Sequence, residues 1–205
     1  MAGLPPRPDD ILPTYERVGA AWAAQRDTSL FERAVLDRFV AAAPGPAVLD
    51  LGCGAGEPIA RYLQGRGCRV TGVDGAVTMV ALFRRALPQA RAVHADMRAL
   101  ALGERFDGIL AFNSYFHLSP DDQRAMFAVF AAHAAPGAAL LLTTGPAAGV
   151  AYGTVADMPV YHASLSPTEY RRLLAAHGFA EVAFLPEDPG CRGHTIWLAR
   201  YREAA

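Results

Sequence analysis

Three glycines at alternate positions, Gly52, Gly54 and Gly56, follow an apolar run that ends near Asp50. Glycine adopts positive φ angles and carries no side chain, so a ligand can approach the backbone of such a turn closely. A helical pattern begins at Ile59, and the first N–H groups of a helix have no intrahelical partner. The stretch therefore predicts a strand, a tight nucleotide-cradling loop and a helix. A glycine-rich turn that holds no ligand is the alternative.

The spacing of this loop restricts the ligand. A dinucleotide fingerprint requires a third glycine where Glu57 stands, and the phosphate-binding pattern that ends in Gly-Lys-Ser/Thr is absent from the sequence. A carboxylate at this place would repel a pyrophosphate, whereas acidic surroundings suit a positively charged ligand. The absence of a Tyr-x-x-x-Lys pair also disfavours a nicotinamide oxidoreductase.

Two further acids follow strand-like segments. Asp74 closes the segment 69–74, and Asp96 comes two residues after the segment 91–94. In doubly wound sheets, ligands bind beyond the carboxyl ends of the strands, where these acids would lie. A helix cap is the alternative role for Asp74, and a surface turn is the alternative for Asp96.

The composition limits the classes of protein. The chain has 205 residues, of which 52% are apolar and 19% are charged, and a formal net charge of -1. This suits one α/β domain and gives no general attraction to nucleic acid. The three cysteines form no metal-ligand spacing, which indicates a reducing, cytoplasmic setting. The proline-rich start is not typical of a signal peptide, and the longest apolar region, about 125–142, is interrupted by Pro136-Gly137, so no membrane span is expected.

Alternating strand and helix patterns predict the elements that position these residues. Strands are expected at 47–51, 69–74, 91–94, 106–112, 138–144, 180–185 and 194–201. Helices are expected from Thr14, from a capping box at 29–32 to about 42, after the glycine loop to about 65, and at 76–87, 119–135 and 166–177. Residues 1–12 are expected to form a loose tail, and 145–164 a functional or mobile loop.

Short strands separated by helices imply parallel pairing with right-handed crossovers, whereas the last two strands are joined too tightly to be parallel. The fold class is therefore α/β, a doubly wound and mostly parallel sheet of six or seven strands. Helices cover both faces, and an antiparallel hairpin ends the chain. We expect a helical lid segment at 1–43 and a Rossmann-like domain at 44–205, which form a single domain overall.

The motif from Asp50 to Gly56 resembles the first motif of the class I S-adenosylmethionine-dependent methyltransferases of the small-molecule type, and the resemblance spans roughly Val48 to Ala199. It implies S-adenosylmethionine as cofactor and S-adenosylhomocysteine as product. In that family Asp74 would bind the ribose, Asp96 and Met97 the adenine, and the first helix would cover the cofactor. The cofactor-binding residues implied in this way are Trp22, Arg26, Asp50, Gly52, Gly54, Gly56, Asp74, Gly75, Met79, Asp96, Met97 and Asn113.

The segment Asn113-Ser114-Tyr115-Phe116-His117 follows the fourth expected strand and would lie over the transferred methyl group. It is similar to the Asn/Asp-Pro-Pro-Tyr/Phe motif of amino methyltransferases but lacks both prolines, which argues against an enzyme that methylates nucleic acid bases. The candidate catalytic bases are His117 and His194, with a structural histidine as the alternative. The candidate substrate-binding residues are Tyr15, Tyr115, Tyr152, His162 and Arg192, with a packed aromatic pair as the alternative for Tyr115 and Phe116.

These residues predict in-line transfer of a methyl group to an oxygen, nitrogen or sulfur atom of a small-molecule acceptor. A non-catalytic S-adenosylmethionine-binding or regulatory protein of the same fold is the alternative. The expected partners are a small-molecule acceptor and neither nucleic acid, membrane nor metal. The expected assembly is a monomer or a homodimer.

Overall fold

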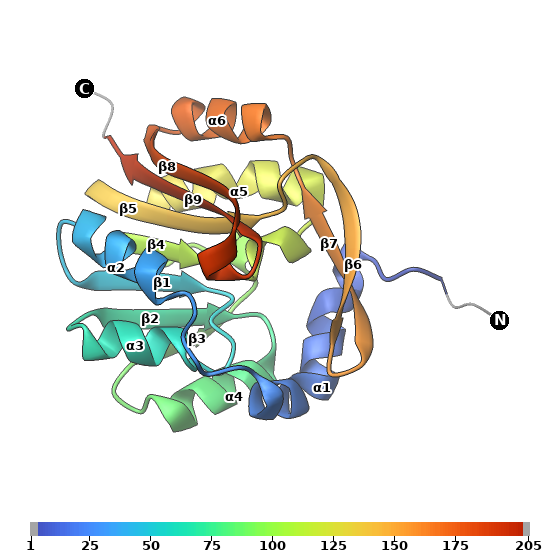
Figure 1. Ribbon diagram of the computed structural model, residues 1–205. Coiled ribbons are helices and arrows are strands. Elements are labelled where there is room, and N and C mark those ends of the chain that lie inside the picture. Colours follow the sequence, from blue (N-terminus) through green and yellow to red (C-terminus); the bar gives the residue numbers. More distant parts are fainter. Residues whose placement is uncertain (1–3, 203–205) are drawn as a thin grey trace.

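A seven-stranded sheet forms the centre of the computed structural model, which describes residues 4–202 (Figure 1). The strand order is β3-β2-β1-β4-β5-β9-β8. The strands span Ala47–Leu51 (β1), Arg69–Asp74 (β2), Arg91–His94 (β3), Phe106–Ala111 (β4), Ala134–Thr144 (β5), Phe179–Asp188 (β8) and His194–Tyr201 (β9). The expected bounds of β1, β2, β3 and β9 are confirmed, whereas β5 and β8 are longer than expected.

The pairing of the strands is parallel except at β9. Val48 of β1 lies opposite Val70 of β2 on one side and Gly108 of β4 on the other, both in parallel register. β9 runs antiparallel to both of its neighbours, β5 and β8. The doubly wound, mostly parallel sheet with an antiparallel end is therefore confirmed, and the strand order reverses direction between β1 and β4.

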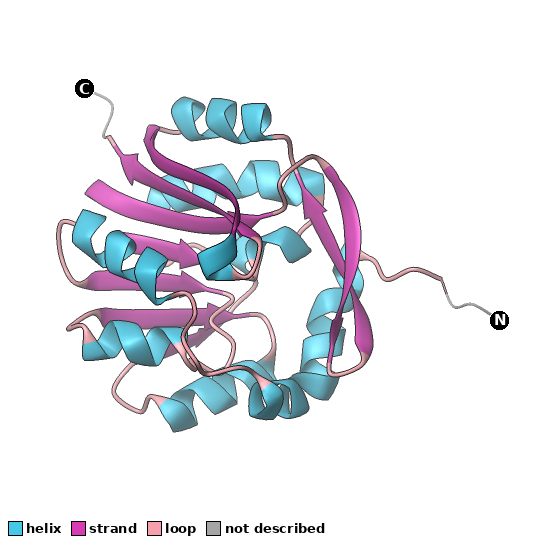
Figure 2. Cartoon of the chain, viewed as in Figure 1, coloured by secondary structure: helices cyan, strands magenta, loops and turns pink. Residues whose placement is uncertain are grey.

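Helices pack on both faces of the sheet (Figure 2). They span Ile11–Gln25 (α1), Arg33–Ala42 (α2), Ile59–Gly65 (α3), Val77–Ala86 (α4), Pro120–His133 (α5) and Pro167–Ala176 (α6). Alternate strand residues face opposite sides: Leu49 packs in the cluster that contains α5 and α6, whereas Val48 packs in the cluster that contains α2 and α3. The expected caps Ser119 and Ser166 accept hydrogen bonds from Asp122 N–H and Glu169 N–H.

Two expectations for the N-terminal part are wrong. Residues 1–3 lie outside the described part, but the rest of the expected loose tail contains a 3-10 helix at Pro8–Asp10, and α1 begins at Ile11. Ile11 is buried against a hairpin that is distant in the sequence, which no local pattern reveals. The capping box also fails, because α2 begins after Glu32, whose carboxylate pairs with Arg26 and caps nothing.

The expected loop at 145–164 is instead an antiparallel hairpin of β6, Gly149–Val155, and β7, Met158–Ser164. Its two turn residues, Ala156 and Asp157, both have positive φ angles, as a two-residue hairpin turn requires. The turn lacks the Asn-Gly or Asp-Gly pair that usually indicates a two-residue hairpin turn. Most of β6 is exposed, so its apolar residues show no alternation that would indicate a strand.

The hairpin and α1 pack together beyond the carboxyl ends of the parallel strands (Figure 1). Ile11 of α1 is buried with Val155, Val160, Tyr161 and Ala163 of the hairpin. This third, smaller core holds α1 over the edge of the sheet to which the expected ligand-binding loops lead.

Candidate active site

A pocket opens between α1 and the carboxyl edge of the sheet, with about 1020 Å³ of space including its open mouth. Residues of the loops after β1, β2, β3 and β4 line it together with residues of α1. All twelve residues expected to bind the cofactor line this one pocket: Trp22, Arg26, Asp50, Gly52, Gly54, Gly56, Asp74, Gly75, Met79, Asp96, Met97 and Asn113. Tyr15 and His117 line it as well.

In the glycine loop after β1, close packing requires a glycine at position 52, whereas the glycine at position 54 leaves the backbone accessible. A Cβ atom on Gly52 would lie 2.3 Å from Cβ of Ser114, so no side chain fits there. A Cβ atom on Gly54 would meet only the Trp22 ring, at 3.8 Å. Both glycines have positive φ angles, which other residues rarely adopt. Gly54 therefore leaves the backbone open to the pocket between the loop and α1.

Asp50 is an ionisable group that faces the pocket without a partner. It is 4% exposed, and within residues 4–202 its carboxylate accepts no hydrogen bond. Burial and, to a smaller extent, the charge of Asp74 raise the pKa of Asp50 to about 7, although Arg26 opposes the rise. A buried carboxylate that lacks donors is stabilised by a cation. An ammonium group of a ligand fits this position, which is the end of the pocket where the resemblance places the methionine part of the cofactor.

Asp74, at the end of β2, is held by two backbone groups. Its Oδ2 accepts a hydrogen bond from Gly54 N–H, and its Oδ1 accepts one from Ala76 N–H, both at 2.9 Å. The bond from Ala76, the N-cap residue of α4, matches the capping role that the sequence left open. Each carboxylate oxygen has a second lone pair, so the same group can also accept ribose hydroxyls, and this role stays a prediction.

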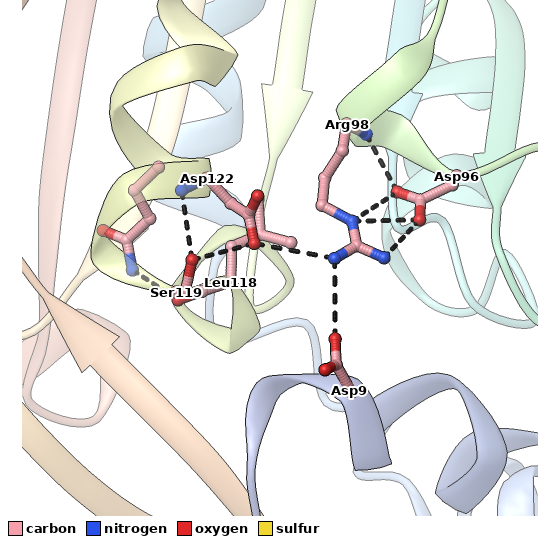
Figure 3. Close-up of polar contacts among 7 residues, drawn as sticks. Asp9, Asp96, Arg98, Leu118, Ser119 and Asp122 are labelled. Atoms are coloured by element: carbon pink, nitrogen blue, oxygen red, sulfur yellow. Dashed lines mark hydrogen bonds and ion pairs between the residues drawn. The ribbon is translucent and has the colours of Figure 1, made fainter.

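Asp96 faces the pocket beside a positive charge that sequence reasoning missed. Its carboxylate accepts hydrogen bonds from the backbone N–H and the guanidinium group of Arg98 (Figure 3). Arg98 also lies 3.5 Å from Asp122 of α5 and 3.9 Å from Asp9, which precedes α1. The hydrogen bonds from Arg98 lower the pKa of Asp96. Asp96 is therefore held as an anion at the pocket wall, and the adenine role of Asp96 stays a prediction.

Tyr15 and His117 meet at the side of the pocket where the reacting atoms are expected. The Tyr15 hydroxyl lies 3.1 Å from Nε2 of His117, and Nδ1 of His117 lies 2.9 Å from the carbonyl oxygen of Tyr161. A carbonyl only accepts, so Nδ1 carries the proton and Nε2 accepts the bond from Tyr15. Burial lowers the pKa of His117 to about 4. The histidine is therefore neutral at pH 7, and its unprotonated nitrogen, Nε2, already accepts a hydrogen bond from Tyr15.

The other two candidate histidines lie next to this pair without lining the pocket. The ring of His162 is 4.8 Å from the His117 ring and 4.5 Å from the Phe116 ring. His194 stacks on Phe116 with ring centroids 6.4 Å apart, and also contacts Phe112, which lines the pocket. Burial lowers the pKa of both histidines. His194 as a base and His162 as a substrate contact stay predictions.

Three candidate substrate-binding residues lie away from the pocket. The Tyr115 ring is fully buried in the core and its hydroxyl donates to the carbonyl oxygen of Gln123, which matches the packing alternative. Tyr152 is 55% exposed on β6. Arg192 pairs with Asp27 and lies over the Phe31 ring. None of these three residues lines the pocket.

Asn113, directly after β4, shows two signs of a functional position. It has a positive φ angle of 54°, and its side-chain oxygen is buried with no hydrogen-bond partner in the part of the chain that the structure describes. Strained backbone and unsatisfied polar atoms concentrate at functional sites. A donor from a bound ligand would satisfy this oxygen.

Sequence reasoning missed several pocket residues besides Arg98. They are Pro8, Ile11, Leu12, Cys53, Ala55, Glu57, Ile59, Phe112, Ser114 and Leu118. Those near the N-terminus carried no signal, because they reach the site only through the packing of α1 on the hairpin. Those in the glycine loop could have been found, since they flank residues already singled out.

Within residues 4–202, no group of three histidine, cysteine or acidic side chains is placed to hold a metal ion. The helices in the same range include none with the length and apolar character that crossing a membrane demands.

Comparison with known proteins shows similarity to methyltransferases. Residues 48–137 match the family model described as a methyltransferase domain. A dTDP-3-amino-3,6-dideoxy-alpha-D-glucopyranose N,N-dimethyltransferase from Streptomyces fradiae is 36% identical over 92 residues, which are 44% of this chain and 36% of that protein. A trans-aconitate 2-methyltransferase from Azoarcus sp. (strain BH72) is 36% identical over 99 residues, 46% of this chain and 37% of that protein. The matched stretches thus span little more than a third of these relatives.

The fold is also that of a solved structure. The DhpI-SAH complex superposes with a TM-score of 0.74 at 20% identity, and the match covers 96% of this chain and 98% of that one. This likeness extends over nearly the whole chain, so it includes α1, the sheet and the hairpin. The chain thus contains a region similar to a methyltransferase domain, at residues 48–137, and shares the fold of a protein solved in complex with SAH.

Proposed function

We propose that this protein binds S-adenosylmethionine and transfers its methyl group to an oxygen, nitrogen or sulfur atom of a small-molecule acceptor. The observation that carries the proposal is the pocket itself. It brings the unpartnered carboxylate of Asp50 and the acids Asp74 and Asp96 together with the neutral pair Tyr15 and His117. In this proposal the acids bind the cofactor and the pair contacts the acceptor.

The proposed binding mode follows from the charges and polarity of the residues that line the pocket. Asp50 accepts the ammonium group of the amino-acid end, and Arg26 provides a positive charge for the carboxylate. Asp74 accepts the ribose hydroxyls from its place beside Gly54 N–H. Asp96 accepts the amino group of the adenine. Trp22 and Met79, which also line the pocket, cover the apolar parts of the ligand.

The cofactor supplies a methyl group that the sulfonium has already activated. The protein therefore needs mainly to align the acceptor with it, and orientation can supply roughly 7 to 11 kcal/mol of barrier reduction. Tyr15 contacts the acceptor through its hydroxyl, and His117 holds that hydroxyl in place. The proton of the acceptor passes to the oxygen of Tyr15 as the proton of Tyr15 passes to Nε2 of His117.

The low pKa of His117 restricts when this proton moves. A group with a pKa of about 4 takes a proton only from a strongly acidic donor. A base of such low pKa contributes little before attack, which is compatible with acceptors that react as neutral amines and need no base at that stage. A general base contributes roughly a hundredfold to ten-thousandfold, which is less than orientation supplies.

The further expectations for the whole protein remain proposals. Residues 1–43 include α1, which covers the pocket as the lid, and α2, which packs on the sheet. The curated relatives act on an amino sugar nucleotide and on trans-aconitate according to their names, so we propose a small acceptor without choosing between such classes. We also propose a cytoplasmic monomer or homodimer that does not act on nucleic acid.

A thermal-shift titration tests the cofactor first. S-adenosylhomocysteine at about a hundred times its dissociation constant should stabilise the fold by about 2.7 kcal/mol. NAD, NADP and ATP serve as controls and should leave the melting temperature unchanged. A response to a nicotinamide nucleotide, or to none of these ligands, would contradict the proposal.

Release of S-adenosylhomocysteine from S-adenosylmethionine in the presence of a panel of small amines, hydroxy compounds and thiols tests the activity. Turnover with one member supports the enzyme. Tight cofactor binding without turnover on any class of acceptor would favour the alternative, a non-catalytic S-adenosylmethionine-binding protein.

A further inference from the structure

Glu32 is a fully buried acid outside the pocket. Its side chain has no exposed surface, and its Oε1 lies 3.3 Å from Nη2 of Arg26, whose side chain is 16% exposed. Its other oxygen, Oε2, is buried and has no hydrogen-bond partner within residues 4–202. A buried carboxylate is costly to fold even when it is paired. Because the cap of α2 does not use this side chain, its place is explained by what it does to Arg26.

Arg26 lies at the C-terminal end of α1 and is held from two sides. Its Nε donates to the carbonyl oxygen of Glu57 in the glycine loop at 3.1 Å, and its Nη2 donates to Glu32. Its guanidinium carbon lies 5.2 Å from the centre of the Trp22 ring. Nη1 has no partner in the described part of the chain. The guanidinium group is thus fixed in position and keeps one nitrogen free, and the residue lines the pocket.

Arg26 is the positive charge at the amino-acid end of this pocket. Arg26 and Asp50 line the same pocket, and the charge of Arg26 lowers the pKa of Asp50. The other arginine of the pocket wall, Arg98, is bonded to Asp96, the residue proposed to bind the adenine. A ligand that carries an ammonium beside Asp50 and a carboxylate beside Arg26 would satisfy both groups. An amino acid end has this pair of charges.

We propose that Glu32 is a positioning residue that holds the Arg26 guanidinium so that its free nitrogen binds the carboxylate of the cofactor's amino-acid end. The inference rests on the proposed binding of S-adenosylmethionine. Glu32 does not touch the ligand and acts only through Arg26. The position of Glu32 matters because its charge-assisted hydrogen bond with Arg26 is directional. Among residues 4–202, no solvent-exposed group replaces Glu32 as the partner of Arg26 Nη2.

The test compares S-adenosylmethionine with its decarboxylated form, S-adenosylmethioninamine, which keeps the ammonium and lacks only the carboxylate. Calorimetry gives the dissociation constants of both ligands for the wild type, Glu32→Gln, Arg26→Gln and the double variant. The wild type should prefer S-adenosylmethionine by roughly tenfold or more, the size of one charge-assisted bond. Glu32→Gln should reduce this preference severalfold. The double variant should show no smaller preference than Arg26→Gln alone, because both changes act on one contact.

Asp27→Asn is the matched control. Asp27 lies in the same linker between α1 and α2, but its partner is Arg192 outside the pocket. The variant should keep the wild-type preference. The double variant removes both charges of the pair and leaves neither unpaired, so it should be more stable than Glu32→Gln alone.

The outcomes distinguish a failure of the proposed cofactor binding from a failure of the proposed role of Glu32. If the wild type binds neither ligand, the proposed function fails and the role of Glu32 falls with it. If the wild type prefers S-adenosylmethionine and Glu32→Gln weakens both ligands equally, Glu32 has only a structural role and the inference is overturned. A preference lost in Glu32→Gln and kept in Asp27→Asn supports it.

Discussion

The Tyr15 hydroxyl lies 3.1 Å from Nε2 of His117, although the two residues are 102 positions apart in the chain. The contact joins α1 to the loop after β4, and the carbonyl oxygen of Tyr161 in the hairpin accepts from the other nitrogen of the ring. Burial raises the pKa of Tyr15 and lowers that of His117. Both groups are therefore neutral at pH 7, and one hydrogen bond orients the tyrosine oxygen.

The first prediction concerns this contact. Tyr15→Phe removes the hydroxyl and keeps the ring, so we expect kcat to fall roughly tenfold to a hundredfold, the lower part of the range for a proton-transfer group. The affinity for S-adenosylhomocysteine should stay within about threefold, because a positioning hydroxyl on the acceptor side is not needed for the cofactor. Methyl transfer to the best acceptor of the panel and calorimetry measure the two quantities. Tyr152→Phe, on an exposed strand outside the pocket, is the control and should change neither.

The second prediction concerns the pH dependence of cofactor binding. In the proposed binding mode the ligand ammonium binds the ionised form of Asp50, whose pKa is raised to about 7 by burial and by Asp74. Affinity for S-adenosylhomocysteine should therefore rise between pH 5 and 8 and become constant above that range. Asp50→Asn should bind more weakly and lose the rise. An equal rise in the variant would mean that another group governs it.

The same shift has the opposite sign for the stability of the free protein. A carboxyl whose folded pKa is raised binds a proton in the folded state that the unfolded state has already lost. Asp50 therefore lowers the free energy of unfolding as the pH rises from about 4, its unfolded pKa, to about 7. Because His117 has a lowered pKa, it contributes the reverse trend between about 4 and 6.5. Only the difference between wild type and Asp50→Asn isolates the contribution of Asp50, and this difference should grow with pH.

The sheet was predictable because most of its strands are short runs rich in apolar residues, separated by helical patterns and turn residues. The loop from Asp50 to Gly56 and the acids at the strand ends follow from the same pattern, and the pocket gathers all of them. What failed depends on contacts between distant segments. The hairpin β6–β7 is stabilised by α1, and Glu32 lies inside because Arg26 reaches it. A single sequence carries no local signal for such contacts.

The residues expected on the acceptor side of the pocket were likewise only partly predictable from the sequence. Tyr115 and His117 are two residues apart, yet one is in the core and the other lines the pocket. The 3-10 turn at 115–117 points the two side chains in different directions, which the sequence pattern does not specify. Residues on irregular segments are therefore assigned a side of the fold only when the backbone is known.

The third prediction separates two glycines of the same loop. Gly54→Ala adds a Cβ that meets only Trp22, at 3.8 Å, so the positive φ angle should cost about 1 to 2 kcal/mol of stability. Gly52→Ala brings a Cβ 2.3 Å from Ser114, and it should lower the melting temperature considerably more. Gly54→Ala should also weaken binding of S-adenosylhomocysteine, because the new methyl group occupies the space between the loop and Trp22. Thermal melts with and without the ligand distinguish the two effects. Similar melting temperatures for the two variants would contradict the assignment.

The fourth prediction separates the two roles of Asp74. Its carboxylate accepts hydrogen bonds from Gly54 N–H and Ala76 N–H, so Asp74→Asn places an amide N–H against one of these donors and should destabilise the loop. If Asp74 also binds the ribose, the wild type should prefer S-adenosylhomocysteine over its 2′-deoxy analogue by roughly tenfold, as expected for one hydrogen bond to a charged group. The variant should lose this preference in addition to affinity. A variant that binds both ligands more weakly but keeps the wild-type ratio would limit Asp74 to bracing the loop and the start of α4.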